Sequence, residues 1–195
     1  CYLLESASQT EVWGRYSFLG YEPVMEITCT DGYMKIRHTE VGNDEVVTKQ
    51  VAHPGDTLRE ILKEYKSPVM EEMPPFTGGL VGYFSYDYIK YSEPKLKLGE
   101  HEDPDFRDMD LMLFDQVIAF DHYRQKVLLI TGVMLDDLEK SYQKAEKKLQ
   151  EMADLIRDGE KEEFPSLKLA SEIKPQFPKE KYCDMVEKAK YYIHE

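Results

Sequence analysis

Two apolar runs in the second half of the chain constrain its fold more than any other feature. The first runs from Leu111 to Phe120 and the second from Lys126 to Val133, with the polar segment 121–125 between them. Apolar runs joined by so short a link are typical of neighbouring antiparallel strands. The sequence therefore predicts a β-sheet with a buried hairpin in this region.

A second hairpin is predicted nearer the start of the chain. Residues 25–29 and 33–37 alternate between apolar and polar side chains, and Asp31-Gly32 separates them. An Asp-Gly pair between alternating segments favours a tight hairpin turn. Three further stretches have the composition of strands, at residues 1–6, 15–20 and 76–87.

Three segments have the periodicity or punctuation of helices. The first is expected between a capping-box pattern with Thr57 at the N-cap and a stop at Pro68. The second is expected to open at residues 136–137, and the last to begin at Pro178. The second helix has apolar side chains spaced four and three residues apart, at Leu138, Tyr142, Ala145, Leu149, Met152 and Ile156.

The order of these elements indicates the fold class. Strands cluster instead of alternating with single helices, which predicts an α+β fold of mostly antiparallel β-sheets packed with helices. We expect a first domain over residues 1–158, a proline-containing linker over 159–176, and the first helix of a further, truncated domain over 177–195. The chain starts at Cys1 and runs out inside a predicted helix, so we expect it to be a piece of a longer protein.

Composition excludes two classes of partner. The net charge of −13 argues against nucleic acid, whose phosphates require basic surface. The sequence contains neither a signal peptide nor eighteen consecutive apolar residues, so no membrane span is predicted. Three widely spaced cysteines fit neither a disulfide framework nor a zinc site, and a cytoplasmic location is expected.

No catalytic or metal site is predicted from the residues themselves. The glycines at 78, 79 and 82 match neither phosphate-binding pattern, so they are interpreted as a bulge or close backbone approach within a strand. The acidic segment 101–105 lacks the spacing of a calcium loop and is interpreted as a solvated surface. Nucleophile motifs are absent from the sequence.

One constellation near the N-terminus could bind an amino acid. If the strands predicted around residues 1–6 and 15–20 are neighbours, Glu5, Ser6, Arg15 and Ser17 lie close together at one end of a sheet. Carboxylate and hydroxyl oxygens could accept hydrogen bonds from an ammonium group, and the guanidinium could donate to a carboxylate. The alternative is a strand edge whose polar side chains satisfy backbone groups.

Several segments carry a resemblance to a known enzyme family. They are Leu3-Leu4-Glu5-Ser6, residues 14–20, residues 75–87, and Pro104-Asp105 followed by residues 111–115 and 117–122. In this order, across nearly all of residues 1–135, they resemble the N-terminal domain of the large subunit of anthranilate synthase, component I. Residues 177–193 are similar to the helix that enters the chorismate-binding domain of that family.

The resemblance implies a parent enzyme that converts chorismate and ammonia to anthranilate and pyruvate in tryptophan biosynthesis. It also implies Mg²⁺ as cofactor, and a glutamine amidotransferase subunit as the partner that supplies ammonia. In this family the chorismate and Mg²⁺ residues belong to a C-terminal domain outside the chain. The chain by itself is therefore expected to contain no catalytic residues and to be inactive.

The same resemblance implies a feedback site for L-tryptophan. The Leu-Leu-Glu-Ser motif assigns Leu4, Glu5 and Ser6 to this site, with Ser6 the strongest assignment, and Arg15 and Ser17 are added because of their expected proximity. Two alternatives stay open. One is aminodeoxychorismate synthase component I, and the other is a non-enzymatic amino-acid-binding regulatory domain.

Overall fold

A computed structural model of the chain describes residues 1–6, 14–39, 45–93, 95–96, 106–160, 165–166 and 168–195. These residues separate into two compact units, Cys1–Gly159 and Glu160–Glu195. The first unit contains every strand that the structure describes, and the second contains helix α3 (Lys179–His194). The predicted division into a domain, a linker and part of a further domain stays a prediction.

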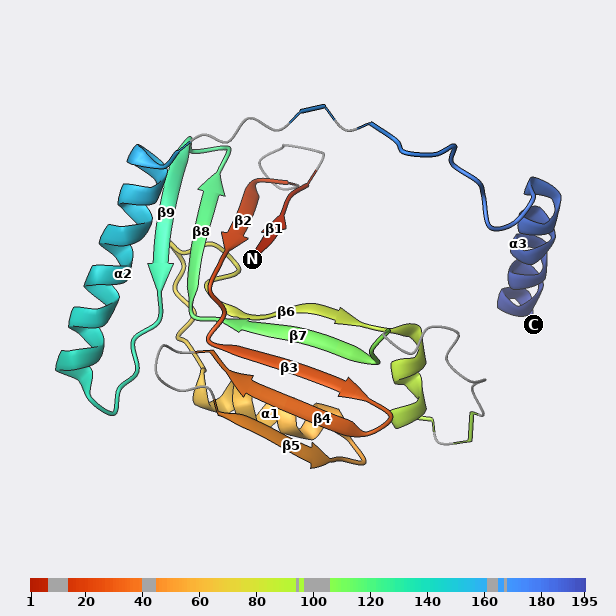
Figure 1. The fold of residues 1–195 in the computed structure, drawn as a ribbon, viewed down its shortest axis with the longest axis horizontal. Helices are drawn as coiled ribbons and strands as arrows, with labels where there is room; N and C mark the ends of the chain where they lie inside the picture. The colour runs from red at the N-terminus through yellow and green to blue at the C-terminus, as the bar shows by residue number, and fades with distance from the viewer. Residues whose placement is uncertain (7–13, 40–44, 94, 97–105, 161–164, 167) are drawn as a thin grey trace. The chain divides into compact units, whose positions relative to one another are not determined.

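Two antiparallel sheets build the first unit (Figure 1). The four-stranded sheet has the order β1 (Tyr2–Leu4), β2 (Tyr16–Gly20), β8 (Gln116–Asp121) and β9 (Lys126–Thr131). The five-stranded sheet has the order β5 (Val46–Gln50), β4 (Tyr33–His38), β3 (Met25–Thr30), β7 (Met109–Phe114) and β6 (Gly79–Phe84). All neighbouring pairs are antiparallel, and helices pack beside them, so the predicted α+β class is confirmed.

The hairpin predicted at Asp31-Gly32 is confirmed. Strands β3 and β4 pair from Met25↔His38 to Thr30↔Tyr33, and both turn residues have positive φ angles, 49° for Asp31 and 79° for Gly32. Glycine adopts that conformation without steric cost, and aspartate tolerates it better than most residues. The turn chemistry therefore fixes the register of this sheet.

The long apolar run from Leu111 to Phe120 is divided between the two sheets, so its prediction as one strand of a hairpin is wrong. Strand β7 ends at Phe114 in the five-stranded sheet, and β8 begins at Gln116 in the four-stranded sheet. Asp115 stands between them, where its carbonyl accepts the N–H of Gly132 at 2.7 Å and its carboxylate accepts a bond from Lys148 at 2.7 Å. The predicted pairing with the following run is confirmed by the β8–β9 register.

Helix α1 (Pro54–Glu64) begins one turn before the predicted N-cap, so the capping-box prediction at Thr57 is wrong. Pro54 stands at the first helical position, where its fixed φ suits a helix and its missing N–H has no intrahelical partner to lose. Thr57 is instead buried inside the helix, beside Leu58 and Ile61. Leu58 and Ile61 pack into the main core of the five-stranded sheet, and Figure 1 shows α1 behind β4 and β5.

Helix α2 (Leu138–Asp158) begins where predicted, with Asp137 as its N-cap. Its apolar stripe is buried only in part, because Ala145 and Met152 are buried whereas the first and last members of the stripe are exposed. The helix is roughly 31 Å long and β9, on which it packs, roughly 20 Å. The strand therefore covers only part of the predicted stripe. Among the described helices, none is long and apolar enough to cross a membrane.

One element of the first unit has no counterpart in the sequence prediction. Residues 86–91, at the end of the aromatic and glycine-rich segment, form the 3₁₀ helix η1 (Tyr86–Tyr91). Strand β6 occupies only Gly79–Phe84 of that segment. The interpretation of its glycines is confirmed at Gly82, where a Cβ would lie 2.0 Å from the Asp110 carbonyl oxygen of β7 at a φ of 154°.

This close approach predicts a large effect of one methyl group. Gly82→Ala is expected to lower the free energy of unfolding by at least about 2 kcal/mol, because the backbone of β7 must move away. Gly132→Ala is the matched control, since its Cβ would make only ordinary contacts, 3.6 Å from Asp115 O, and the effect should stay below about 1 kcal/mol. Urea unfolding of both variants measures the difference. Equal losses would contradict the assignment of Gly82 to close backbone approach.

Candidate functional site

The predicted amino-acid site lies at one end of the four-stranded sheet. Strands β1 and β2 pair with Tyr2↔Gly20 and Leu4↔Phe18, so the expected neighbourhood of these two strands is confirmed. Glu5 and Ser6 directly follow β1, and Leu4, Glu5 and Ser6 are all exposed. This end of β1 therefore offers an apolar side chain, a carboxylate and a hydroxyl at the surface of the unit.

Arg15 bonds to the strand on the other side of β2. Its Nε donates to Asp121 Oδ1 at 3.0 Å and its Nη2 to Asp121 Oδ2 at 2.7 Å, which is a bidentate arrangement. The guanidinium carbon also lies 4.8 Å from the ring centre of Tyr16 and 5.6 Å from that of Tyr123. Hydrogen bonding by the guanidinium holds the pKa of the buried Asp121 carboxyl at about 2, below its ordinary value. Arg15 is therefore held by β8.

Ser17 is held by His122, the residue that directly follows β8. Its hydroxyl oxygen lies 2.7 Å from Nε2 of His122, and only 4% of the Ser17 surface is exposed. Strand β2 lies between β1 and β8 in the sheet. The two parts of the predicted amino-acid site therefore have different surroundings. Leu4, Glu5 and Ser6 are exposed at the end of β1, whereas Arg15 is bonded to Asp121 and Ser17 to His122.

A second polar cluster, the Asp108 network, was not predicted from sequence. Asp108 has no exposed surface, and its Oδ2 accepts bonds from the Tyr91 hydroxyl and the Asp31 backbone N–H, each at 2.7 Å. Lys90 Nζ lies 2.8 Å from Asp108 Oδ1 and 2.6 Å from Asp31 Oδ1. The Tyr91 hydroxyl also accepts the N–H of Gly32 at 2.7 Å.

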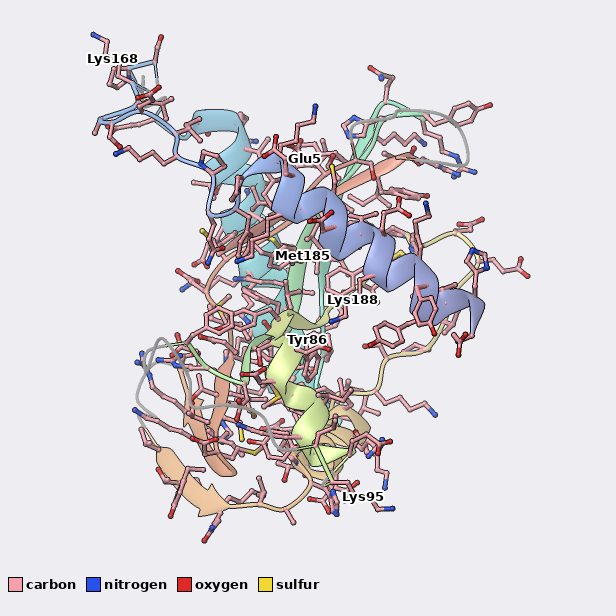
Figure 2. All side chains as sticks on the ribbon, turned by 90° about the vertical axis from the view of Figure 1, so that its right-hand side faces the viewer. Glu5, Tyr86, Lys95, Lys168, Met185 and Lys188 are labelled. Carbon is pink, nitrogen blue, oxygen red and sulfur yellow. The ribbon has the colours of Figure 1, made fainter. Side chains whose placement is uncertain are left out.

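The charges in this network compensate for burial. Burial opposes ionisation of Asp108, but hydrogen bonds from Lys90 and Tyr91 outweigh it and lower the carboxyl pKa. Burial likewise opposes the charge on Lys90, and its bonds to Asp108 and Asp31 raise the ammonium pKa on balance. The network attaches η1 to the turn between β3 and β4. Figure 2 shows Glu5 and Tyr86 lying apart, so η1 is distant from the β1 end. We assign the network a structural role.

The described residues offer no metal site. Among them, no three His, Cys, Asp or Glu side chains gather closely enough to hold a metal ion. The acidic segment 101–105, interpreted from sequence as solvated surface, lies outside the residues that the structure describes. Asp121 is the last residue of β8, and its carboxylate also accepts the backbone N–H of Arg124 at 3.0 Å, as an end-capping residue does.

Comparison with known proteins defines the class of this fold and sequence. The model of the family described as chorismate binding enzyme matches residues 1–195. Since the match extends over the whole chain, the chain belongs to the chorismate-binding enzyme family.

Individual relatives narrow this class. The chain is 34% identical over 200 residues to anthranilate synthase component 1 of Acinetobacter calcoaceticus, with 98% of this chain and 38% of the relative covered. It is 32% identical over 202 residues to aminodeoxychorismate synthase component 1 of Bacillus subtilis, with the same coverage of 98% and 38%. The crystal structure of anthranilate synthase component I from Streptococcus pneumoniae TIGR4 matches with a TM-score of 0.65 and 27% identity, over 97% of this chain and 40% of that one.

These matches confirm the resemblance to anthranilate synthase component I. They also show that the chain spans about two fifths of the length of the relatives that it matches. The activity, substrates and partners of the whole protein are therefore proposals.

The Arg15–Asp121 pair predicts an acid-sensitive contribution to stability. Because the folded pKa of Asp121 is depressed to about 2, the pair stabilises the fold fully above about pH 4, the ordinary aspartate pKa, and this contribution falls as the pH drops through about 2. Asp121→Asn should lower the free energy of unfolding by about 2 kcal/mol at pH 7. The difference in free energy of unfolding between this variant and the unmodified chain should disappear as the pH falls below 4. Urea unfolding at a series of pH values measures this difference.

The exposed pair Asp56–Arg59, at 2.8 Å with 69% and 73% of the two side chains exposed, supplies the control. Asp56→Asn should change stability by less than about 0.5 kcal/mol at any pH. A gap for Asp121→Asn that stayed constant from pH 7 to pH 2 would contradict a role of its charge.

Proposed function

We propose that this chain is the N-terminal regulatory part of an anthranilate synthase component I. The parent enzyme would convert chorismate and ammonia to anthranilate and pyruvate in tryptophan biosynthesis. Support comes from membership of the chorismate-binding enzyme family, and from the matches to enzymes of this name that cover 97–98% of the chain. The single observation that carries the proposal is the Leu-Leu-Glu-Ser segment, exposed at the end of β1.

The catalytic chemistry is proposed to reside outside this chain. The residues that the structure describes do not fit a Mg²⁺ ion, since no group of three acidic, histidine or cysteine side chains gathers among them. Mg²⁺, chorismate and the glutamine amidotransferase subunit that supplies ammonia are therefore proposed for the parent protein, and no reaction step is derived from these residues. We expect the chain alone to be inactive. A cytoplasmic location is proposed from the cysteines described as free, Cys1, Cys29 and Cys183.

The regulatory ligand that we propose is L-tryptophan. The Glu5 carboxylate can accept hydrogen bonds from the ammonium group of an amino acid, and the Ser6 hydroxyl can donate to a carboxylate or accept from an ammonium group. Leu4, with 46% of its surface exposed, can contribute apolar contact to an indole ring. An indole needs burial on several sides, and an exposed strand end supplies only one wall. We therefore propose that the parent protein supplies the remaining walls.

A shared site would explain feedback inhibition. Tryptophan bound between this part and the rest of the enzyme would favour one arrangement of the two, and inhibition follows if chorismate binds or reacts better in the other. Arg15 and Ser17 are proposed to belong to the same site, although their bonds to Asp121 and His122 support an indirect contribution.

The second candidate function is that of aminodeoxychorismate synthase component I. The Bacillus subtilis relative of that name is 32% identical to this chain, close to the 34% of the Acinetobacter calcoaceticus anthranilate synthase component. Sequence identity alone therefore does not decide whether the product is anthranilate or aminodeoxychorismate. A non-enzymatic amino-acid-binding regulatory domain is less well supported, because the relatives named here are components of synthases.

Product analysis tests the proposed reaction. The complete protein, incubated with chorismate, ammonia and Mg²⁺, is expected to form anthranilate and pyruvate in equal amounts, and chromatography with mass detection measures both. Aminodeoxychorismate without release of pyruvate would contradict the proposal and favour the second candidate. If chorismate were not consumed, the enzymatic proposal would be wrong.

Replacement of Ser6 tests the regulatory site. Ser6→Phe is expected to raise the tryptophan concentration for half-inhibition of the complete protein at least about tenfold, because the ring occupies the space of the ligand and removes the hydroxyl. Ser92→Phe, the same change at an exposed position after η1, is the matched control and should leave inhibition unchanged. Unaltered inhibition of the Ser6 variant would exclude Ser6 from the site.

A further inference from the structure

Two side chains, one at the end of β8 and one directly after it, contact Arg15 and Ser17 of the proposed tryptophan site. Asp121 is the last residue of β8, and His122 follows it. Neither belongs to the set assigned to tryptophan by resemblance. Both are nevertheless bonded to members of that set, Asp121 to Arg15 and His122 to Ser17.

Asp121 fixes the guanidinium in position and direction. It is only 4% exposed, and its carboxylate accepts hydrogen bonds from Nε and Nη2 of Arg15 at 3.0 and 2.7 Å. The same carboxylate accepts the backbone N–H of Arg124, so the turn after β8 holds it in place. Because a bidentate pair fixes the plane of both groups, Arg15 can face a ligand only in the orientation that Asp121 allows.

His122 restricts the Ser17 hydroxyl in a similar way. Ser17 pairs with Phe120 across the sheet, and His122, two residues beyond Phe120, reaches back to Ser17 on the same side of the sheet. A hydroxyl has one proton to donate and two lone pairs to accept with. The contact with Nε2 of His122 at 2.7 Å uses either the proton or one lone pair of the Ser17 hydroxyl. Another group can bond only to what remains.

We infer that Asp121 and His122 are positioning residues of the tryptophan site. They hold Arg15 and Ser17 in place at the start of β2. Residues 4–6, at the end of β1, lie beside this part of β2. Binding then benefits from polar groups that are already ordered before the ligand arrives. This inference rests on the proposed function, because it assumes that tryptophan binds at this end of the sheet.

A double-mutant cycle tests the inference in the complete protein. Tryptophan dissociation constants are measured by calorimetry for Ser17→Ala, His122→Phe and the two changes combined. Each single change is expected to weaken binding about tenfold. If His122 acts through Ser17, the double variant is also weakened only about tenfold, whereas independent effects would multiply to about a hundredfold.

Rescue separates positioning from general destabilisation. The side-chain amide nitrogen of His122→Gln can replace Nε2 as a partner of Ser17, so its tryptophan affinity should stay within about threefold of the unmodified protein. The control is Gln50→Ala, at an exposed position at the end of β5 in the other sheet, and it should not change the affinity. Thermal unfolding of each variant shows whether the fold is retained.

Three results would overturn the inference while leaving the proposed function intact. The first is unchanged affinity of His122→Phe, and the second is a hundredfold loss in the double variant. If His122→Phe and His122→Gln lost tryptophan affinity equally, the inference would also be wrong, because a purely structural role of His122 does not depend on its hydrogen bond with Ser17. If the unmodified complete protein bound no tryptophan at all, the proposed regulatory function would fail, and the inference with it.

Discussion

The structure depends on the point at which the chain crosses between its two sheets. It crosses once from β2 to β3, through Tyr21, and once from β7 to β8, at Asp115. The buried side-chain amide of Gln116 donates to the Tyr21 carbonyl at 3.0 Å, and the Val24 N–H donates to Leu113 O at 2.8 Å, so the two crossings are bonded to one another. Buried backbone groups at such a junction must find partners, and these bonds supply them. The junction therefore ties the four-stranded sheet to the five-stranded sheet.

The two sheets differ in how firmly they are built. Among the described residues, the core cluster of the five-stranded sheet contains eleven buried residues, including two from α1. That of the four-stranded sheet contains three, with Ile118 of β8 and Ala145 and Met152 of α2 buried outside it. The five-stranded sheet also has the Asp108 network to hold η1 against its β3–β4 turn. Local opening is easiest where few apolar side chains are buried. The candidate amino-acid site lies on the four-stranded sheet, which has the smaller core cluster.

Local patterns predicted local structure well. The Asp31-Gly32 turn, the β8–β9 pairing and the start of α2 at Asp137 all follow from spacing and turn chemistry within a few residues of each feature. The division of the apolar run at Asp115 and the Asp108 network could not be predicted, because both depend on partners distant in sequence. Lys148 lies 33 positions from Asp115, and Asp31 lies 77 positions from Asp108. A single acidic residue in an apolar run gives no sign of a change of sheet.

The candidate site could also be predicted only in part, because some of its contacts join residues distant in sequence. The motif at residues 3–6 predicts its β1 side, but the partners of Arg15 and Ser17, Asp121 and His122, lie more than 100 positions away. No spacing rule connects such residues before the sheet order is known. From sequence, Arg15 and Ser17 are expected to be available to a ligand. In the structure they are bonded to Asp121 and His122, whereas the end of β1 is exposed.

The central claim is that the tryptophan site is shared between this chain and the remainder of a longer enzyme. Calorimetric titration of L-tryptophan into the 195-residue chain and into the complete protein tests it most directly. The account predicts tight binding by the complete protein, and binding to the chain alone that is weaker by at least about a hundredfold or undetectable, because most of the walls around the indole are missing. Equal affinity for the two proteins would contradict it.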